Sequence, residues 1–144
     1  MDLTQRPPRS PRCRIGGYAL LPRLLDKCRA ELAGKGGEYH YNCPLDQQFM
    51  EFAGIDAEEL KAEVAKGKGD GEILAWIKDH SKLQHTPVEI AQWTAWREQA
   101  APTDTESRAF FNGLHEKAAP AREDIATWPD LLDLDDYVSF GGKP

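Results

Sequence analysis

The chain has 144 residues, about the length of one compact domain, which leaves no room for a multi-domain enzyme. Its composition is 40% hydrophobic and 29% charged, with a formal net charge of -6, which disfavours a disordered tail, a fibre or a basic polyanion binder. The sequence has no Walker loop, dinucleotide-binding fingerprint, HExxH pair, CxxC pair or nucleophile-elbow serine, so no enzyme class is indicated.

Cysteine usage and the N-terminal segment bear on the compartment. An odd number of cysteines (Cys13, Cys28 and Cys43) in a domain of this size predicts reduced thiols in the cytoplasm. The arginine-rich start lacks an apolar region, and no stretch approaches the roughly 18 consecutive apolar residues of a membrane span. We therefore expect neither export nor membrane insertion.

The chain opens with a proline-rich segment that cannot be helical. Pro7, Pro8 and Pro11 each lack an amide hydrogen, which predicts an extended, polyproline-like arm over residues 1–16. Apolar residues then recur at spacings of three and four, which predicts a helix from Pro22 to Ala33.

Turn and cap residues predict the next three helices. Pro44 suits the first position of a second helix, which Gly54 closes in the left-handed conformation. Asp56 caps a third helix that ends at Gly67, and Asp70 caps a fourth.

Thr86 with Glu89 forms a capping box that opens the clearest helix, which runs to about Ala100. Its apolar residues lie nearly all round the cylinder, which predicts that this helix is central and covered on several sides.

The aromatic residues of the chain are interpreted as core residues more readily than as the lining of a ligand pocket. They include Trp76, Trp93, Trp96 and Trp128.

A second capping box, Thr103 with Glu106, predicts a helix that carries an apolar stripe and ends before Pro120. Thr127 opens a last short helix, and only residues 38–42 and 137–140 could form brief extended segments. The sequence therefore predicts an all-α fold: one compact domain over residues 1–144, with six or seven helices and the extended arm packed on the body.

Six sequence segments carry a family resemblance: RPPRSPR, IGGY, LPRLLDK, NCPLD, DGEILAW and DDYVSFGGK. Through these segments, essentially the whole chain resembles the bacterial domain of unknown function 5069 family. That resemblance implies a bacterial, intracellular, stand-alone domain. It supplies no activity and no catalytic residues to transfer.

The segment EYHYNCPLD concentrates the reactive side chains. If Pro44 starts a helix, Cys43 occupies the cap position, where free amide hydrogens and the helix dipole stabilise a thiolate, and His40 or Tyr39 could orient it. Cys43 is therefore expected to ionise most readily of the three thiols. The alternative is that Cys43 is a small buried residue and that the two tyrosines of this segment only pack around it.

No metal site or cofactor is predicted. His40 and Cys43 have a spacing that could place two ligands on one ion, but Cys13, Cys28 and His115 would join them only through tertiary coincidence. The aspartates Asp130, Asp133, Asp135 and Asp136 lack the order of a calcium-binding loop and are expected to form a solvated acidic helix end.

Charge is distributed unevenly along the chain. Residues 1–35 hold eight basic and three acidic residues, a net charge of +5, so the other 109 residues carry -11. We expect the arm to lie as a strap over the acidic body, with arginines paired to carboxylates such as Asp133, Asp135 and Asp136. Nucleic-acid binding is not expected, because the acidic body would repel a phosphate backbone.

These observations favour a non-catalytic intracellular binding or interaction domain, since helices and caps account for most of the sequence. Its partner, a protein or a small molecule, is not specified. The alternative is a small thiol-dependent enzyme or redox sensor centred on Cys43 with His40.

Overall fold

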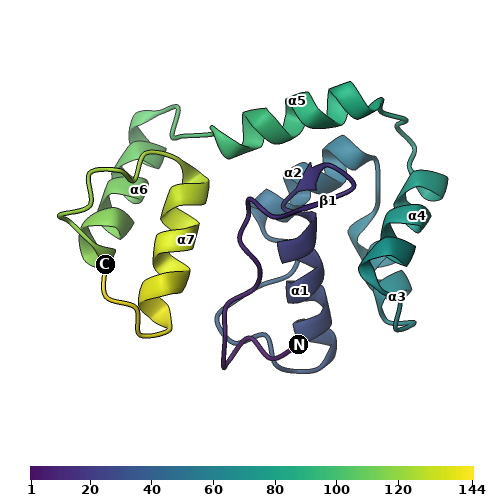
Figure 1. Ribbon diagram of the computed structural model, residues 1–144, viewed down its shortest axis with the longest axis horizontal. Helices are drawn as coiled ribbons and strands as arrows, with labels where there is room; N and C mark the ends of the chain where they lie inside the picture. Colours follow the sequence, from purple (N-terminus) through teal and green to yellow (C-terminus); the bar gives the residue numbers. More distant parts are fainter.

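The computed structural model describes all 144 residues as seven helices and one small two-stranded sheet (Figure 1). The mostly helical fold predicted from the sequence is confirmed. The elements, in chain order, are β1 (Arg14–Ile15), β2 (Tyr18–Ala19), α1 (Leu21–Leu32), α2 (Pro44–Ala53), α3 (Ala57–Val64), α4 (Asp70–His80), α5 (Pro87–Glu98), α6 (Thr105–Ala118) and α7 (Trp128–Ser139).

The sheet is an antiparallel hairpin, and neither of its strands lies in residues 38–42 or 137–140, the two segments for which brief strands were predicted. Its two-residue turn is Gly16–Gly17, and both glycines have positive φ, 59° and 85°, as the tightest hairpin turns require. The prediction of strands in these two segments was wrong. Residues 38–42 form no strand, and residues 137–139 belong to the last turn of α7.

Helix α1, rather than α5, is the central helix. Every residue from Leu21 to Cys28 is buried, including three charged ones. The prediction that α5 is central was wrong, because Val88 and Trp96 on that helix are 65% and 58% exposed. Figure 1 shows α5 running along one edge of the molecule.

Several helix ends follow the predicted cap chemistry. Gly54 closes α2 at a φ of 67°, and a Cβ there would lie 2.8 Å from the Leu83 nitrogen. The Asp56 and Thr127 side chains accept backbone hydrogen bonds at the starts of α3 and α7, as predicted. The cap hydrogen bonds and the left-handed glycine act within the local chain, which explains why the sequence indicates these ends.

Two predicted caps were wrong by one residue. Asp70 is the first residue of α4, after Gly69, and its carboxylate instead binds Arg9 and Arg29. The cap of α6 is Asp104, which accepts a hydrogen bond from the Ser107 nitrogen at 2.7 Å, rather than Thr103. A carboxylate at this position serves as well as a hydroxyl, so the pattern alone did not choose between adjacent residues.

The buried apolar residues form two separate clusters. The larger contains 15 residues from β2, the first five helices and the loops between them, and the smaller contains five residues of the α6–α7 region, including Phe111 and Leu131. The stripe predicted for α6 is only partly buried, since Phe110 and Leu114 are exposed. The α6–α7 hairpin therefore has its own small core (Figure 1).

The N-terminal arm contacts both parts of the molecule. Arg9 binds Asp26 and Asp70, with N–O distances of 2.9 and 2.8 Å, and Arg12 binds Asp130 and Asp133 of α7. Pairing of the arm with Asp133 agrees with the prediction. The predicted pairing of the arm with Asp135 and Asp136 was wrong. Asp135 makes no ion pair, and Asp136 binds Arg23 of α1.

Arg97 on α5 is a buried cation without an acidic partner. It is 4% exposed, its only side-chain hydrogen bond goes to the Gln48 amide oxygen at 2.6 Å, and its Nε has no partner. Burial lowers the pKa of this guanidinium, which indicates that burying its charge reduces the stability of the fold.

Arg97→Met is therefore expected to leave the free energy of unfolding unchanged or to raise it by about 1 kcal/mol, because an apolar chain of similar length avoids burying a charge. Urea denaturation would measure the change. Exposed Arg108, replaced in the same way, serves as the control and should have little effect. A large loss of stability in Arg97→Met would show that this cation has a stabilising partner.

Candidate functional site

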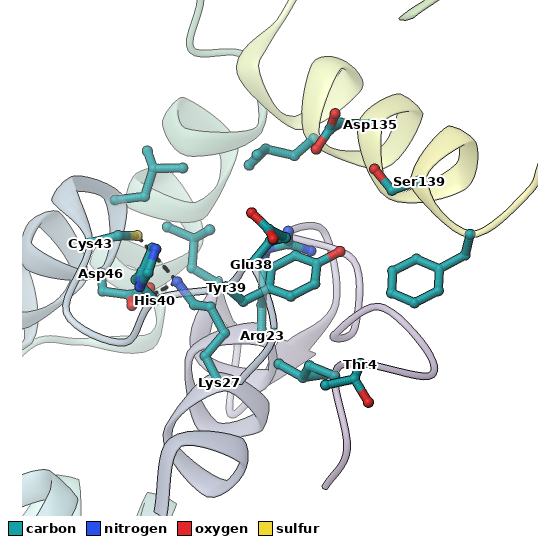
Figure 2. Close-up of a pocket in the computed structure, with 16 residues that line it drawn as sticks. Thr4, Arg23, Lys27, Glu38, Tyr39, His40, Cys43, Asp46, Asp135 and Ser139 are labelled. Atoms are coloured by element: carbon teal, nitrogen blue, oxygen red, sulfur yellow. Dashed lines mark hydrogen bonds and ion pairs between the residues drawn. The ribbon is translucent and has the colours of Figure 1, made fainter. Parts of the chain in front are cut away.

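A cleft of about 610 Å³ lies where helix α7 faces the first two helices. One wall comes from α1, the loop of residues 36–43 and the start of α2, and the other comes from α7 and the segment after it. Figure 2 shows these side chains converging on the same space. The cleft thus separates elements that belong to the two different apolar clusters.

The loop before α2 is held in place by backbone contacts. The Leu3 nitrogen donates to the Lys35 oxygen at 2.9 Å, and a Cβ on Gly37 would lie 2.9 Å from the Leu3 oxygen. Asn42 then adopts a left-handed conformation, with a φ of 61°, immediately before Cys43. This turn places Cys43 at the cap position of α2 with Pro44 first in the helix, as the sequence predicted.

Cys43, Lys27 and Asp46 form a contact cluster in the cleft wall. Lys27 Nζ donates to Cys43 Sγ at 3.2 Å and lies 2.7 Å from Asp46 Oδ2. Lys27 is 5% exposed and Asp46 is 2% exposed, whereas Cys43 is half-buried. The approach to Asp46 is an ion pair without hydrogen-bond geometry, so Asp46 Oδ2 has no hydrogen-bond donor.

Two features of this cluster bring positive charge close to the Cys43 sulfur. The ammonium of Lys27 and the N-terminal amides of α2 both place positive charge near the sulfur. The other two thiols have different surroundings: Cys13 is exposed on the arm, and burial raises the pKa of Cys28 to about 12. Cys43 is thus the one thiol that combines a cleft with a neighbouring cation.

A second buried ion pair joins the two walls of the cleft. Arg23 on α1 binds both carboxylate oxygens of Asp136 on α7, at 2.6 and 3.2 Å. The Tyr39 hydroxyl donates to the same carboxylate at 2.6 Å, and burial together with this hydrogen bond raises the pKa of Tyr39. The two halves of the molecule are therefore tied at one side of the cleft by a fully paired charge.

The remaining charged residues of the cleft are acidic and lack ion-pair partners. Glu38 and Asp135 both line the cleft and are exposed (Figure 2). Partial desolvation of its carboxyl group by the cleft walls and the neighbouring carboxylate of Asp136 raise the pKa of Asp135. Since Arg23 and Lys27 are already paired, the unpaired charge available to a ligand is negative.

The candidate residues named from the sequence do not all act together. His40 lines the cleft but is exposed and makes no hydrogen bond to Cys43, whose polar contact is Lys27. Sequence reasoning missed Lys27 because Arg23, Asp26 and Lys27 form the polar face of α1, a pattern normally typical of a solvated surface. Spacing alone does not show that a polar face is buried.

A metal-ligand cluster and the tryptophans are both absent from the cleft. No group of three His, Cys, Asp or Glu side chains lies close enough to hold a metal ion. None of the four tryptophans lines the cleft. Trp93 stacks on Phe52 beside the larger apolar cluster, and Trp128 packs edge-on against Phe111 in the smaller one, so these two residues serve packing.

The fold and the cleft together define a mostly helical protein in which two apolar clusters flank a polar-lined cavity. The chain belongs to the family described as a domain of unknown function (DUF5069), whose model matches residues 5–138. No curated protein matches the chain. None of its helices combines the length and the apolar character needed to cross a membrane.

Proposed function

We propose that this protein is a binding domain that holds a small molecule in the cleft between α1, α2 and α7. The observation that carries the proposal is the cavity of about 610 Å³, which falls within the range of roughly 300–1,000 Å³ typical of ligand pockets. Leu20, Leu45 and Leu132 contribute apolar side chains to the lining, and polar side chains from both walls contribute the rest. This mixture is the usual lining of a small-molecule site.

Backbone strain beside the cleft supports the same function. Leu20 and Asn42 are the two non-glycine residues with positive φ, at 69° and 61°. Leu20 lines the cleft, and Asn42 immediately precedes Cys43 in its wall. A left-handed leucine costs on the order of 1–3 kcal/mol, and such strain concentrates at functional sites.

The charges of the cleft favour an amine-bearing ligand with an apolar body. Arg23 and Lys27 are engaged by Asp136 and Asp46, so they attract a ligand carboxylate only weakly. The unpaired Glu38 and Asp135, both exposed in the lining of the cleft, instead provide acceptors for a cation.

Reversible disulfide capture tests this proposal without knowledge of the natural ligand. The protein would be equilibrated with small disulfide fragments carrying an amine, a neutral group or a carboxylate, in the presence of 2-mercaptoethanol, and each adduct would be located by peptide mass mapping. We expect Cys43 to retain amine fragments at least about tenfold more than carboxylate fragments, equivalent to roughly 1.4 kcal/mol.

The same molecule supplies the reference site. Cys13 is exposed on the arm between Arg12 and Arg14, so it should show no preference for amines. Asp135→Asn should reduce the selectivity at Cys43, whereas Glu116→Gln, an exposed position on α6 outside the cleft, should not. The proposal would be contradicted if Cys43 and Cys13 retained the amine, neutral and carboxylate fragments in the same order of preference.

Thiol chemistry at Cys43 is the second candidate function. The contact that favours it is the 3.2 Å approach of Lys27 Nζ to Cys43 Sγ. A small thiol-dependent enzyme or a redox sensor needs an accessible thiolate, and a neighbouring ammonium at a helix N-terminus promotes that state. His40, the partner expected from the sequence, is near enough to line the same cleft but makes no hydrogen bond to the sulfur.

A further inference from the structure

The pair Lys27 and Cys43 brings a nucleophilic amine and an oxidisable thiol into direct contact. Their Nζ and Sγ atoms lie 3.2 Å apart, and the side chains come from different elements, α1 and the cap of α2. Figure 2 shows both at the same end of the cleft, together with Asp46. Two reactive atoms already in contact need little movement to form a bond.

The surroundings of the pair confine the two atoms while leaving the sulfur open to a small oxidant. Lys27 is 5% exposed, so its ammonium cannot swing freely into solvent. Cys43 is half-buried and lines the cleft, which is wide enough for a peroxide molecule. Asp46 Oδ2 lies 2.7 Å from Lys27 Nζ, close enough to take a proton from the ammonium.

From this geometry we propose that Cys43 and Lys27 form a reversible sulfur–nitrogen crosslink when hydrogen peroxide oxidises the thiol. The cluster is then an oxidant-sensitive modification site in the cleft wall. The bond does not require a bound ligand, so its absence would leave the binding function standing.

The chemistry takes two steps. The thiolate attacks one peroxide oxygen and breaks the O–O bond; with one proton taken up, the products are the sulfenic acid of Cys43 and one water molecule. Lys27 then passes a proton to Asp46, and its free amine attacks the sulfenic sulfur. The S–N bond forms as the S–O bond breaks, and the departing hydroxide becomes water by taking the proton from Asp46. The second proton lost by nitrogen goes to solvent.

The overall change oxidises the thiol by two electrons and reduces one peroxide molecule to two water molecules. The protein loses two hydrogen atoms, about 2 Da, and the positive charge of Lys27 disappears from the cleft wall. Asp46 would then lack its ammonium partner, so the electrostatics of this end of the cleft would change with oxidation. A thiol reductant reverses the bond by attacking sulfur and releasing the amine.

The test uses full-length protein with Cys13→Ser, because Cys13 is exposed and would form disulfides between molecules. After treatment with hydrogen peroxide, intact mass spectrometry is expected to show a loss of about 2 Da. Proteolysis and fragmentation should then place the link between Lys27 Nζ and Cys43 Sγ. Dithiothreitol should restore the original mass.

Two variants separate this bond from a disulfide with Cys28, which follows Lys27 directly in the chain. Lys27→Arg should abolish the 2 Da loss and leave a sulfenic acid on Cys43 that dimedone traps, and Cys28→Ala should retain the crosslink. The fragmentation spectrum of the parent protein gives the same assignment if either variant fails to fold. A link to Cys28, a sulfenic acid that persists beside unmodified Lys27, or an unreacted Cys43 would each overturn the proposal.

Discussion

Arg23→Leu is expected to lower the free energy of unfolding by about 3–5 kcal/mol, because it leaves the carboxylate of Asp136 buried without its cation. Arg23 and Asp136 are 5% and 6% exposed, and the guanidinium contacts both carboxylate oxygens. Urea denaturation followed by circular dichroism would measure the loss. The Tyr39 hydroxyl would remain as a donor to Asp136, but a neutral group cannot replace the missing charge.

A double variant shows whether the effect comes from the unpaired charge. Arg23→Leu with Asp136→Leu should recover much of the lost stability, because two apolar residues remove both buried charges. Arg14→Leu is the matched control: Arg14 binds Glu98 at 2.8 Å but is 54% exposed, and its loss should cost less than about 1 kcal/mol. Equal losses for Arg23→Leu and Arg14→Leu would refute the role of burial.

In the folded protein, iodoacetamide is expected to modify Cys43 at least about 100-fold faster than Cys28, because only an accessible thiolate reacts. Cys28 is fully buried, and that burial raises its pKa to about 12, whereas Cys43 lines the cleft. Peptide mapping at timed intervals would give the rate at each thiol. Faster reaction at Cys28 would exclude the thiol chemistry proposed for Cys43.

Local sequence chemistry determined much of the secondary structure. Pro44 and Thr127 mark true helix starts, and Gly54 marks a true end, because a missing amide hydrogen, a cap oxygen and a left-handed glycine act through their immediate neighbours. The same reasoning placed Cys43 at the cap of α2. The hairpin around Gly16–Gly17 was not predicted, because its strands are only two residues long and give no alternating pattern.

Tertiary structure alone decided which polar residues are buried. On α1, Arg23 and Lys27 look like solvated residues, yet their partners lie on other elements: Asp136 is 113 positions away, and Asp46 lies on α2. Conversely, the tryptophan-rich α5 looked central, but its Trp96 faces solvent. Helix periodicity records which residues share a face, and burial depends on what packs against that face.

The cleft followed from the same kind of long-range packing. The sequence by itself determined a mostly helical chain, most of its helix boundaries, and a cysteine at a proline-started helix. Only the folded chain brought α7 against α1, set Lys27 beside Cys43 and left Glu38 and Asp135 without cations in the lining of the cleft. Caps and turns are local, whereas ion pairs and cavities arise where residues distant in the chain meet.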